Sequence, residues 1–60
     1  MAHKQLPAFG QVVEVEYVDS WLRRTERLMA VRLRGMWLEA KTRKRLPENR
    51  SLSVARWWPL

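Results

Sequence analysis

The chain has 60 residues, no cysteine, and twelve Lys and Arg against six Asp and Glu, which gives a formal net charge of +6 at pH 7. A chain of this length forms one domain with a small core, and without cysteine no disulfide stabilises it. One histidine, scattered carboxylates and two glycines form neither a metal-ligand spacing nor a phosphate-binding loop, so we expect no metal and no cofactor. No stretch has the length of a signal-peptide core or a membrane span, so we expect a cytoplasmic protein that does not contact membranes.

Residues 1–10 include Pro7 and Gly10 and show no hydrophobic period. They predict an irregular arm ahead of a single small β-rich domain over 11–60. The only histidine, His3, falls in this arm, where it is poorly placed to activate a serine or threonine hydroxyl. We therefore expect a protein that is not an enzyme.

The run QVVEVEYV over 11–18 alternates apolar residues with glutamate. This period of two predicts a half-buried strand. The alternation places Val13, Val15 and Tyr17 in the core and the two glutamates between them on the exposed face.

Residues 19–35 fit two structures, and the sequence leaves the choice open. Ser20 and Gly35 would cap a helix, whereas the alternation over 28–34 suits a strand. We prefer the strand, preceded by a loop or a short helical turn within 19–27. The core residues expected from this strand are Met29, Val31 and Leu33.

Charge is the reason for that preference. A strand places Arg32 and Arg34 on the exposed face, opposite Glu14 and Glu16 of the first strand. Opposite charges that face each other across two strands stabilise a sheet. A helix offers no such pairing.

Two more strands are predicted, over 36–40 and 51–57, and the charged segment KTRKRLPENR over 41–50 connects them. The expected fold is mainly β: an antiparallel meander of three to four strands in a small single domain. Core residues predicted in these two strands are Trp37, Leu52, Val54 and Trp57.

Short motifs in a fixed order run along the chain: LPxxG over 6–10, a valine-rich run over 12–15, GxW over 35–37, and VxxWxPL over 54–60. This order resembles a family of short phage and prophage proteins of unknown function. The resemblance implies an origin in a bacteriophage or prophage, a location in the bacterial host cell and a small β-rich fold. It implies no particular activity.

The adjacent tryptophans near the end of the chain are expected to have different roles. Trp57 matches the tryptophan of the family's WxPL motif, so the resemblance implies a structural residue, which we expect to pack near Trp37 and Phe9. Neighbouring side chains of a strand point to opposite faces, so Trp58 is predicted to be a contact residue. Simple alternation would place Trp58 in the core instead, and this conflict predicts a bulge near Arg56 or a turn before the last proline.

A second resemblance concerns the segment VRLRGMWLEA over 31–40. It is similar to part of a basic bacterial toxin family related to swapped-hairpin transcription factors. This resemblance implies, as an alternative function, a basic toxin-like protein that acts on RNA.

The surplus of positive charge favours an acidic partner. A meander would bring the loops 19–27 and 41–50 to one end and create a basic pole. We expect this pole to bind nucleic acid without sequence specificity, or an acidic face of a host or phage protein, since no helix is predicted to enter the major groove. The predicted binding residues are Arg23, Arg24, Arg27, Lys41, Arg43, Lys44, Arg45 and Arg50.

Exposed aromatic residues offer the competing mode of binding. Trp21 and Trp58 are the predicted aromatic contacts, because tryptophan and arginine dominate protein interfaces. Through such an aromatic face the protein would inhibit a host defence or a host enzyme complex. Free strand edges would also allow it to form a homo-oligomer.

Overall fold

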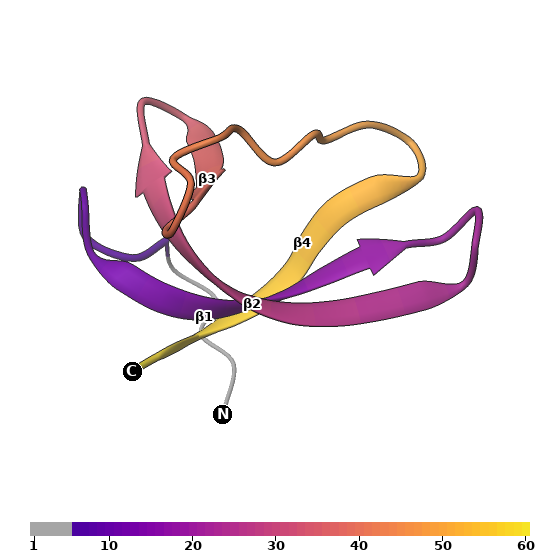
Figure 1. The fold of residues 1–60 in the computed structure, drawn as a ribbon, viewed down its shortest axis with the longest axis horizontal. Helices are drawn as coiled ribbons and strands as arrows, with labels where there is room; N and C mark the ends of the chain where they lie inside the picture. Colours follow the sequence, from indigo (N-terminus) through magenta and orange to yellow (C-terminus); the bar gives the residue numbers. More distant parts are fainter. Residues whose placement is uncertain (1–5) are drawn as a thin grey trace.

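The computed structural model describes residues 6–60, and His3 lies outside them. Four strands form one antiparallel sheet, and no helix occurs in the described residues (Figure 1). This confirms the predicted fold class, a small mainly β protein. The strands are β1 (Val12–Asp19), β2 (Arg24–Leu33), β3 (Met36–Glu39) and β4 (Leu52–Pro59).

The order of the strands in the sheet is β3-β2-β1-β4. The first three strands follow one another as in a meander, but β4 pairs with β1 instead of β3, which corrects the expected neighbour order. The connection over 40–51 runs across the open side of the strongly curved sheet (Figure 1). The apolar strand β1 gains a partner on each side, and the two basic loops are not brought to one pole.

The turn between β1 and β2 is shorter than predicted. β2 begins at Arg24, so the loop or helical turn expected within 19–27 is a tight turn over 20–23. The Leu22 N–H donates a hydrogen bond to Oδ1 of Asp19 at 3.0 Å, and Arg23 has a left-handed φ of 55°. These two features reverse the chain early enough for residues 24–27 to pair with β1.

The faces of β2 are the reverse of the prediction. Val13 pairs with Ala30 and Val15 pairs with Leu28, so these residues of β2 lie on the core face. Met29 lies on the opposite face, where 54% of its surface is exposed, and its predicted place in the core is wrong. The register differs from the expected one by an odd number of residues, which exchanges the two faces of a strand.

The same reversal changes the ion pairs on the outer face, the one that carries Glu14 and Glu16. Glu14 pairs with Arg27, and Glu16 pairs with Arg56 of β4. The predicted pairing with the two arginines near the end of β2 is therefore wrong.

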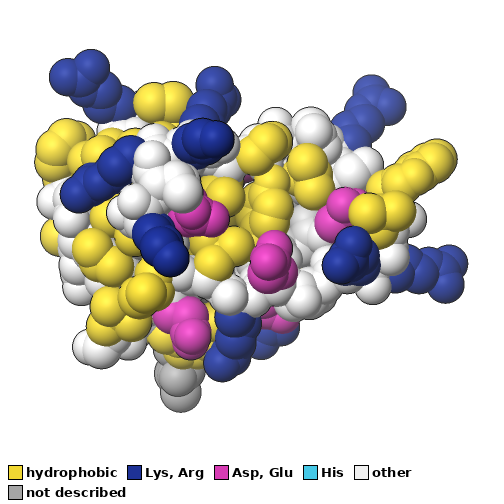
Figure 2. Space-filling view, in the orientation of Figure 1, with side chains coloured by type: hydrophobic (Ala, Val, Ile, Leu, Met, Phe, Trp, Pro, Cys, Tyr) yellow, Lys and Arg dark blue, Asp and Glu magenta, His cyan; other side chains and the backbone are white. Residues whose placement is uncertain are grey.

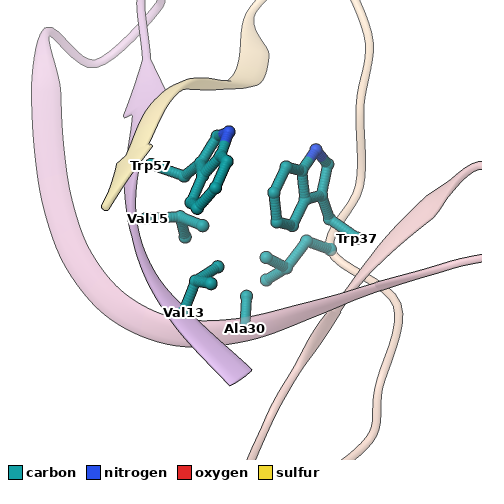
Figure 3. Packing of buried hydrophobic residues seen from close by; sticks show 6 residues of the cluster. Val13, Val15, Ala30, Trp37 and Trp57 are labelled. Carbon is teal, nitrogen blue, oxygen red and sulfur yellow. The ribbon is translucent and has the colours of Figure 1, made fainter. Parts of the chain in front are cut away.

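The core lies on the inner face of the curved sheet. The rings of Trp37 and Trp57 stand over the small side chains of β1 and β2 (Figure 3). The connection contributes Leu46, whose N–H donates to the Trp37 carbonyl oxygen at 2.8 Å. Phe9 is 75% exposed, so the expected contact with the core tryptophans is wrong. Of the other predicted core residues, Val13 and Val15 are buried in contact with the core tryptophans, and Val31 is buried outside that cluster. The remaining four are half-buried: Tyr17, Leu33, Leu52 and Val54.

A bulge separates the two halves of β4. The pairing of β1 with β4 shifts between Glu16 and Tyr17, which leaves Ala55 without an opposite residue. The bulge predicted in this part of the strand is thus confirmed. Beyond it, Trp57 enters the core and Trp58 lies on the outer face.

Candidate nucleic-acid interface

The predicted basic residues divide into three places instead of one pole. Arg23, Arg24 and Arg50 lie at what we call the hairpin end, the turn between β1 and β2 with the segment beside it. The Ser20 N–H donates to the Ser51 carbonyl oxygen at 2.8 Å, which holds this segment against the turn.

Carboxylates offset the three arginines of the hairpin end. Desolvation by burial and the negative charges of Asp19, Glu48 and Glu26 all raise the pKa of the Tyr17 hydroxyl, so these three acids lie near it. A hollow of about 270 Å³ at this end is lined by both acidic and basic side chains, among them Asp19, Arg24 and Glu26. Three acids against three arginines leave the hairpin end with little net charge.

Arg27 lies on the outer face of the sheet, away from both loops. Its guanidinium is 3.5 Å from a carboxylate oxygen of Glu14 and 4.3 Å from the centroid of the Trp58 ring. The arrangement combines an ion pair with a cation–π contact. The guanidinium of Arg27 therefore already contacts a carboxylate and an aromatic ring of the protein itself.

The remaining cations gather around β3, in a set that we call the β3 basic patch. All five of its side chains are exposed, and none forms an ion pair within residues 6–60. Figure 2 shows several Lys and Arg side chains around a carboxylate at the upper left, where Figure 1 places β3, and a second group at the right beside carboxylates. The β3 basic patch consists of Arg34, Lys41, Arg43, Lys44 and Arg45.

Two turns hold the β3 basic patch in place. The turn after β3 is closed by hydrogen bonds of 2.8 Å from the Arg43 N–H to the Glu39 carbonyl oxygen and from the Glu39 N–H to the Lys44 carbonyl oxygen. The turn before β3 consists of Arg34 and Gly35, with φ values of 49° and 76°. Arg34 therefore lies before β3, and the other cations follow it, with Arg45 alongside Leu38 of the strand.

Arginine occupies left-handed backbone positions in both turns. Arg34 has a φ of 49° and Arg43 a φ of 63°. This conformation costs an L-residue roughly 1–2 kcal/mol and is adopted most readily by glycine, followed by asparagine and aspartate. Arg23, in the turn of the hairpin end, has the same kind of conformation, with a φ of 55°.

Sequence reasoning missed Arg34, because we expected glutamates of β1 to neutralise it. The available signal was the glycine that follows it, since two residues ending in glycine between two strands indicate a tight hairpin turn with an exposed tip. Arg32 was left out of the predicted binding residues for the same reason. It is half-buried, with its guanidinium 5.3 Å from the centroid of the Trp37 ring.

The two predicted aromatic contacts lie far apart. Trp21 is 82% exposed at the hairpin end, whereas Trp58 is half-buried beneath Arg27. Trp58 pairs with Glu14, and Trp21 lies beyond Asp19, so about 17 Å of strand separates them. They do not form one aromatic face.

No family model matches the chain, and it shows no significant similarity to the curated proteins or to the solved structures compared with it. The resemblance to phage proteins therefore stays a prediction. Within residues 6–60, no cluster of three or more His, Cys, Asp or Glu side chains could hold a metal ion, and no helix is long and apolar enough to cross a bilayer.

Proposed function

We propose that the protein binds nucleic acid through the β3 basic patch, by contacts with phosphates and without reading the base sequence. The observation that carries this proposal is the five exposed cations around β3, none of which has an ion-pair partner in the described part of the chain. Elsewhere the cations are offset, by the ion pairs of Arg27 and Arg56 and by the acids of the hairpin end. Five cations around the one carboxylate of β3, Glu39, give the β3 basic patch a larger local excess of positive charge than the hairpin end, where three arginines lie near three acids.

The dimensions of the patch suit a polyanion. Four residues of β3 span about 13 Å, and a nucleic-acid duplex carries one phosphate charge per roughly 1.7 Å of its axis. The patch can therefore contact several phosphates at once. No helix in residues 6–60 is available to enter a major groove, so recognition of the backbone is favoured over recognition of bases.

The backbone conformations of Arg34 and Arg43 support the same proposal. Each arginine occupies a position where asparagine or glycine would relieve strain. A charged residue kept there at a cost in stability is consistent with a function of the charge. Because Arg23 of the hairpin end has the same conformation, the proposal rests on the gathering of the cations around β3 and not on strain. With exposed cations as its candidate site, the protein is proposed to act by binding and not as an enzyme.

Two variants with equal changes in charge test the proposal. We expect the patch variant to bind a fluorescein-labelled 20-nucleotide DNA or RNA at least about ten-fold more weakly than the natural protein in fluorescence anisotropy. The hairpin-end variant is expected to stay within about two-fold. Equal losses in the two variants, or no loss in the patch variant, would contradict the proposal. The patch variant carries Lys41→Gln, Arg43→Asn and Lys44→Gln, and the hairpin-end variant carries Arg23→Asn, Arg24→Gln and Arg50→Gln.

A second candidate function is binding to a host or phage protein through the outer face. The stacked pair of Arg27 and Trp58 favours it, together with the exposed Met29 on the same face. Tryptophan and arginine are the side chains that most often dominate protein interfaces. Such binding would depend little on salt and would be lost in Trp58→Ala. As the sequence resemblance suggests, we place either activity in the cytoplasm of a bacterial cell.

A further inference from the structure

We infer that the nucleic acid bound by the β3 basic patch is single-stranded, and that one of its bases stacks on the ring of Phe9. This inference rests on the proposed function and adds to it the class of nucleic acid. It arises from an exposed aromatic side chain that was expected to pack beside Trp57. With 75% of its surface exposed, Phe9 has no role in the core that would explain an aromatic residue there.

Phe9 is presented by an ordered turn. The Gln11 N–H donates to the Ala8 carbonyl oxygen at 3.0 Å, and the Ala8 N–H donates to Oε1 of Gln11 at 3.1 Å. Gly10, with a φ of 77°, supplies the left-handed third residue of this turn. An aromatic ring on a turn closed in this way loses little conformational freedom when it binds.

The turn that holds Phe9 lies beside one end of the β3 basic patch. The Gly10 N–H donates to the Arg32 carbonyl oxygen at 3.3 Å. Arg34 follows two residues later, about 7 Å further along the chain. A phosphate held by Arg34 would therefore leave the attached base within reach of Phe9.

The pairing of an aromatic platform with nearby cations is suited to unpaired bases. Proteins that bind single strands combine a basic surface along the backbone with aromatic side chains on which bases stack. In a duplex the faces of the bases are already stacked on each other, so Phe9 would contribute nothing. Trp21 is at least as exposed as Phe9 but lies at the hairpin end, where acids offset the arginines, so it is the matched control.

The experiment compares single strands with duplexes of equal length. The probes are a fluorescein-labelled 12-nucleotide oligo(dT), its RNA counterpart oligo(U), and a 12-base-pair DNA duplex. We expect the natural protein to prefer both single strands. Phe9→Ala should weaken single-strand binding about five-fold or more and leave duplex binding unchanged, since stacking of a base contributes roughly 1–3 kcal/mol. Phe9→Tyr should retain the affinity, and Trp21→Ala should bind like the natural protein.

The other possible results distinguish a failure of the stacking inference from a failure of the proposed function. If Phe9→Ala binds single strands normally while the patch variant does not, the proposed function stands and the stacking inference is wrong. Equal losses on single strands and duplexes would also overturn it. If Phe9→Ala changes the sedimentation coefficient, Phe9 belongs to a contact between two copies of the chain and not to a base-stacking site. If the natural protein binds none of the probes, the proposed function itself fails.

Discussion

The guanidinium of Arg27 lies 4.3 Å from the centroid of the Trp58 ring while it also pairs with Glu14. This contact joins β2 and β4 across β1 on the outer face of the sheet. Trp57, the preceding residue, is buried on the inner face. The bulge at Ala55 makes this division possible, because it lets the strand keep apolar residues on the inner face both before and after the bulge.

The two tryptophans are expected to differ in their effect on stability. Trp57→Ala removes a large buried side chain from the core, at a cost of about 3–5 kcal/mol, which approaches the whole stability of a domain of this size. Trp58→Ala removes a half-buried ring and one cation–π contact, and should cost about 1–2 kcal/mol. Urea unfolding followed by circular dichroism measures both. A larger loss in Trp58→Ala than in Trp57→Ala would reverse our assignment.

Arg34→Asn should raise stability and weaken binding at the same time. Asparagine followed by glycine is the preferred pair for a turn in which both residues have positive φ, so strain of up to about 1 kcal/mol is relieved. The loss of the guanidinium should reduce affinity for nucleic acid. Thermal unfolding and fluorescence anisotropy on the same sample measure the two effects. Arg34→Lys is the control, and should change neither property appreciably; a fall in stability in Arg34→Asn would contradict the argument from strain.

Arg23 and Arg43 allow a matched comparison, because each lies in a tight turn and has a left-handed φ, of 55° and 63°. Substituting either by asparagine should leave the thermal midpoint unchanged or slightly higher. Only Arg43→Asn is expected to weaken nucleic-acid binding, since the Asp19 carboxylate lies in the same turn as Arg23 and offsets part of its charge. Equal effects of the two substitutions on affinity would mean that position on the molecule is unimportant and net charge alone matters.

Ionisation of Tyr17 should lower stability at high pH. Its hydroxyl donates a hydrogen bond to the Pro47 carbonyl oxygen, and burial and nearby acids raise its pKa above the ordinary value of about 10. The folded state therefore favours the protonated form, and this stabilisation is complete below about pH 10 and lost as the pH rises through the raised pKa. Tyr17→Phe should be less stable than the natural protein at pH 8, by about 1 kcal/mol for the lost hydrogen bond. The difference should shrink by pH 11 in urea unfolding, and a constant difference would contradict the prediction.

The sequence predicted those parts of the fold that depend on local pattern. The alternation around Val13 and Val15 gave the first strand and its buried face. The clash between alternation and the expected role of Trp57 predicted the bulge. The first conclusion needs only neighbouring residues, because the period of a strand is two, whereas the second also used the role that the family resemblance implies for Trp57.

Features that depend on pairing between distant segments were not predictable in this way. β2 carries apolar residues on both faces, so Ala30 and Met29 were equally compatible with the core until the register with β1 was known. The place of β4 beside β1 follows from the path of a long connection, which no local pattern encodes. As a result, the arginines expected at one pole were divided, and Arg34 was left out of the candidate site.

The salt dependence of nucleic-acid binding tests the central claim most directly. Each phosphate neutralised on a single strand contributes about −0.7 to the slope of log Kobs against log salt concentration, so full use of the five cations predicts a slope of roughly −3.5. In the patch variant with Lys41→Gln, Arg43→Asn and Lys44→Gln, the slope should become shallower by about 2. The hairpin-end variant should keep the slope of the natural protein. A slope near zero in the natural protein, or the same change in both variants, would show that the β3 basic patch does not hold the nucleic acid.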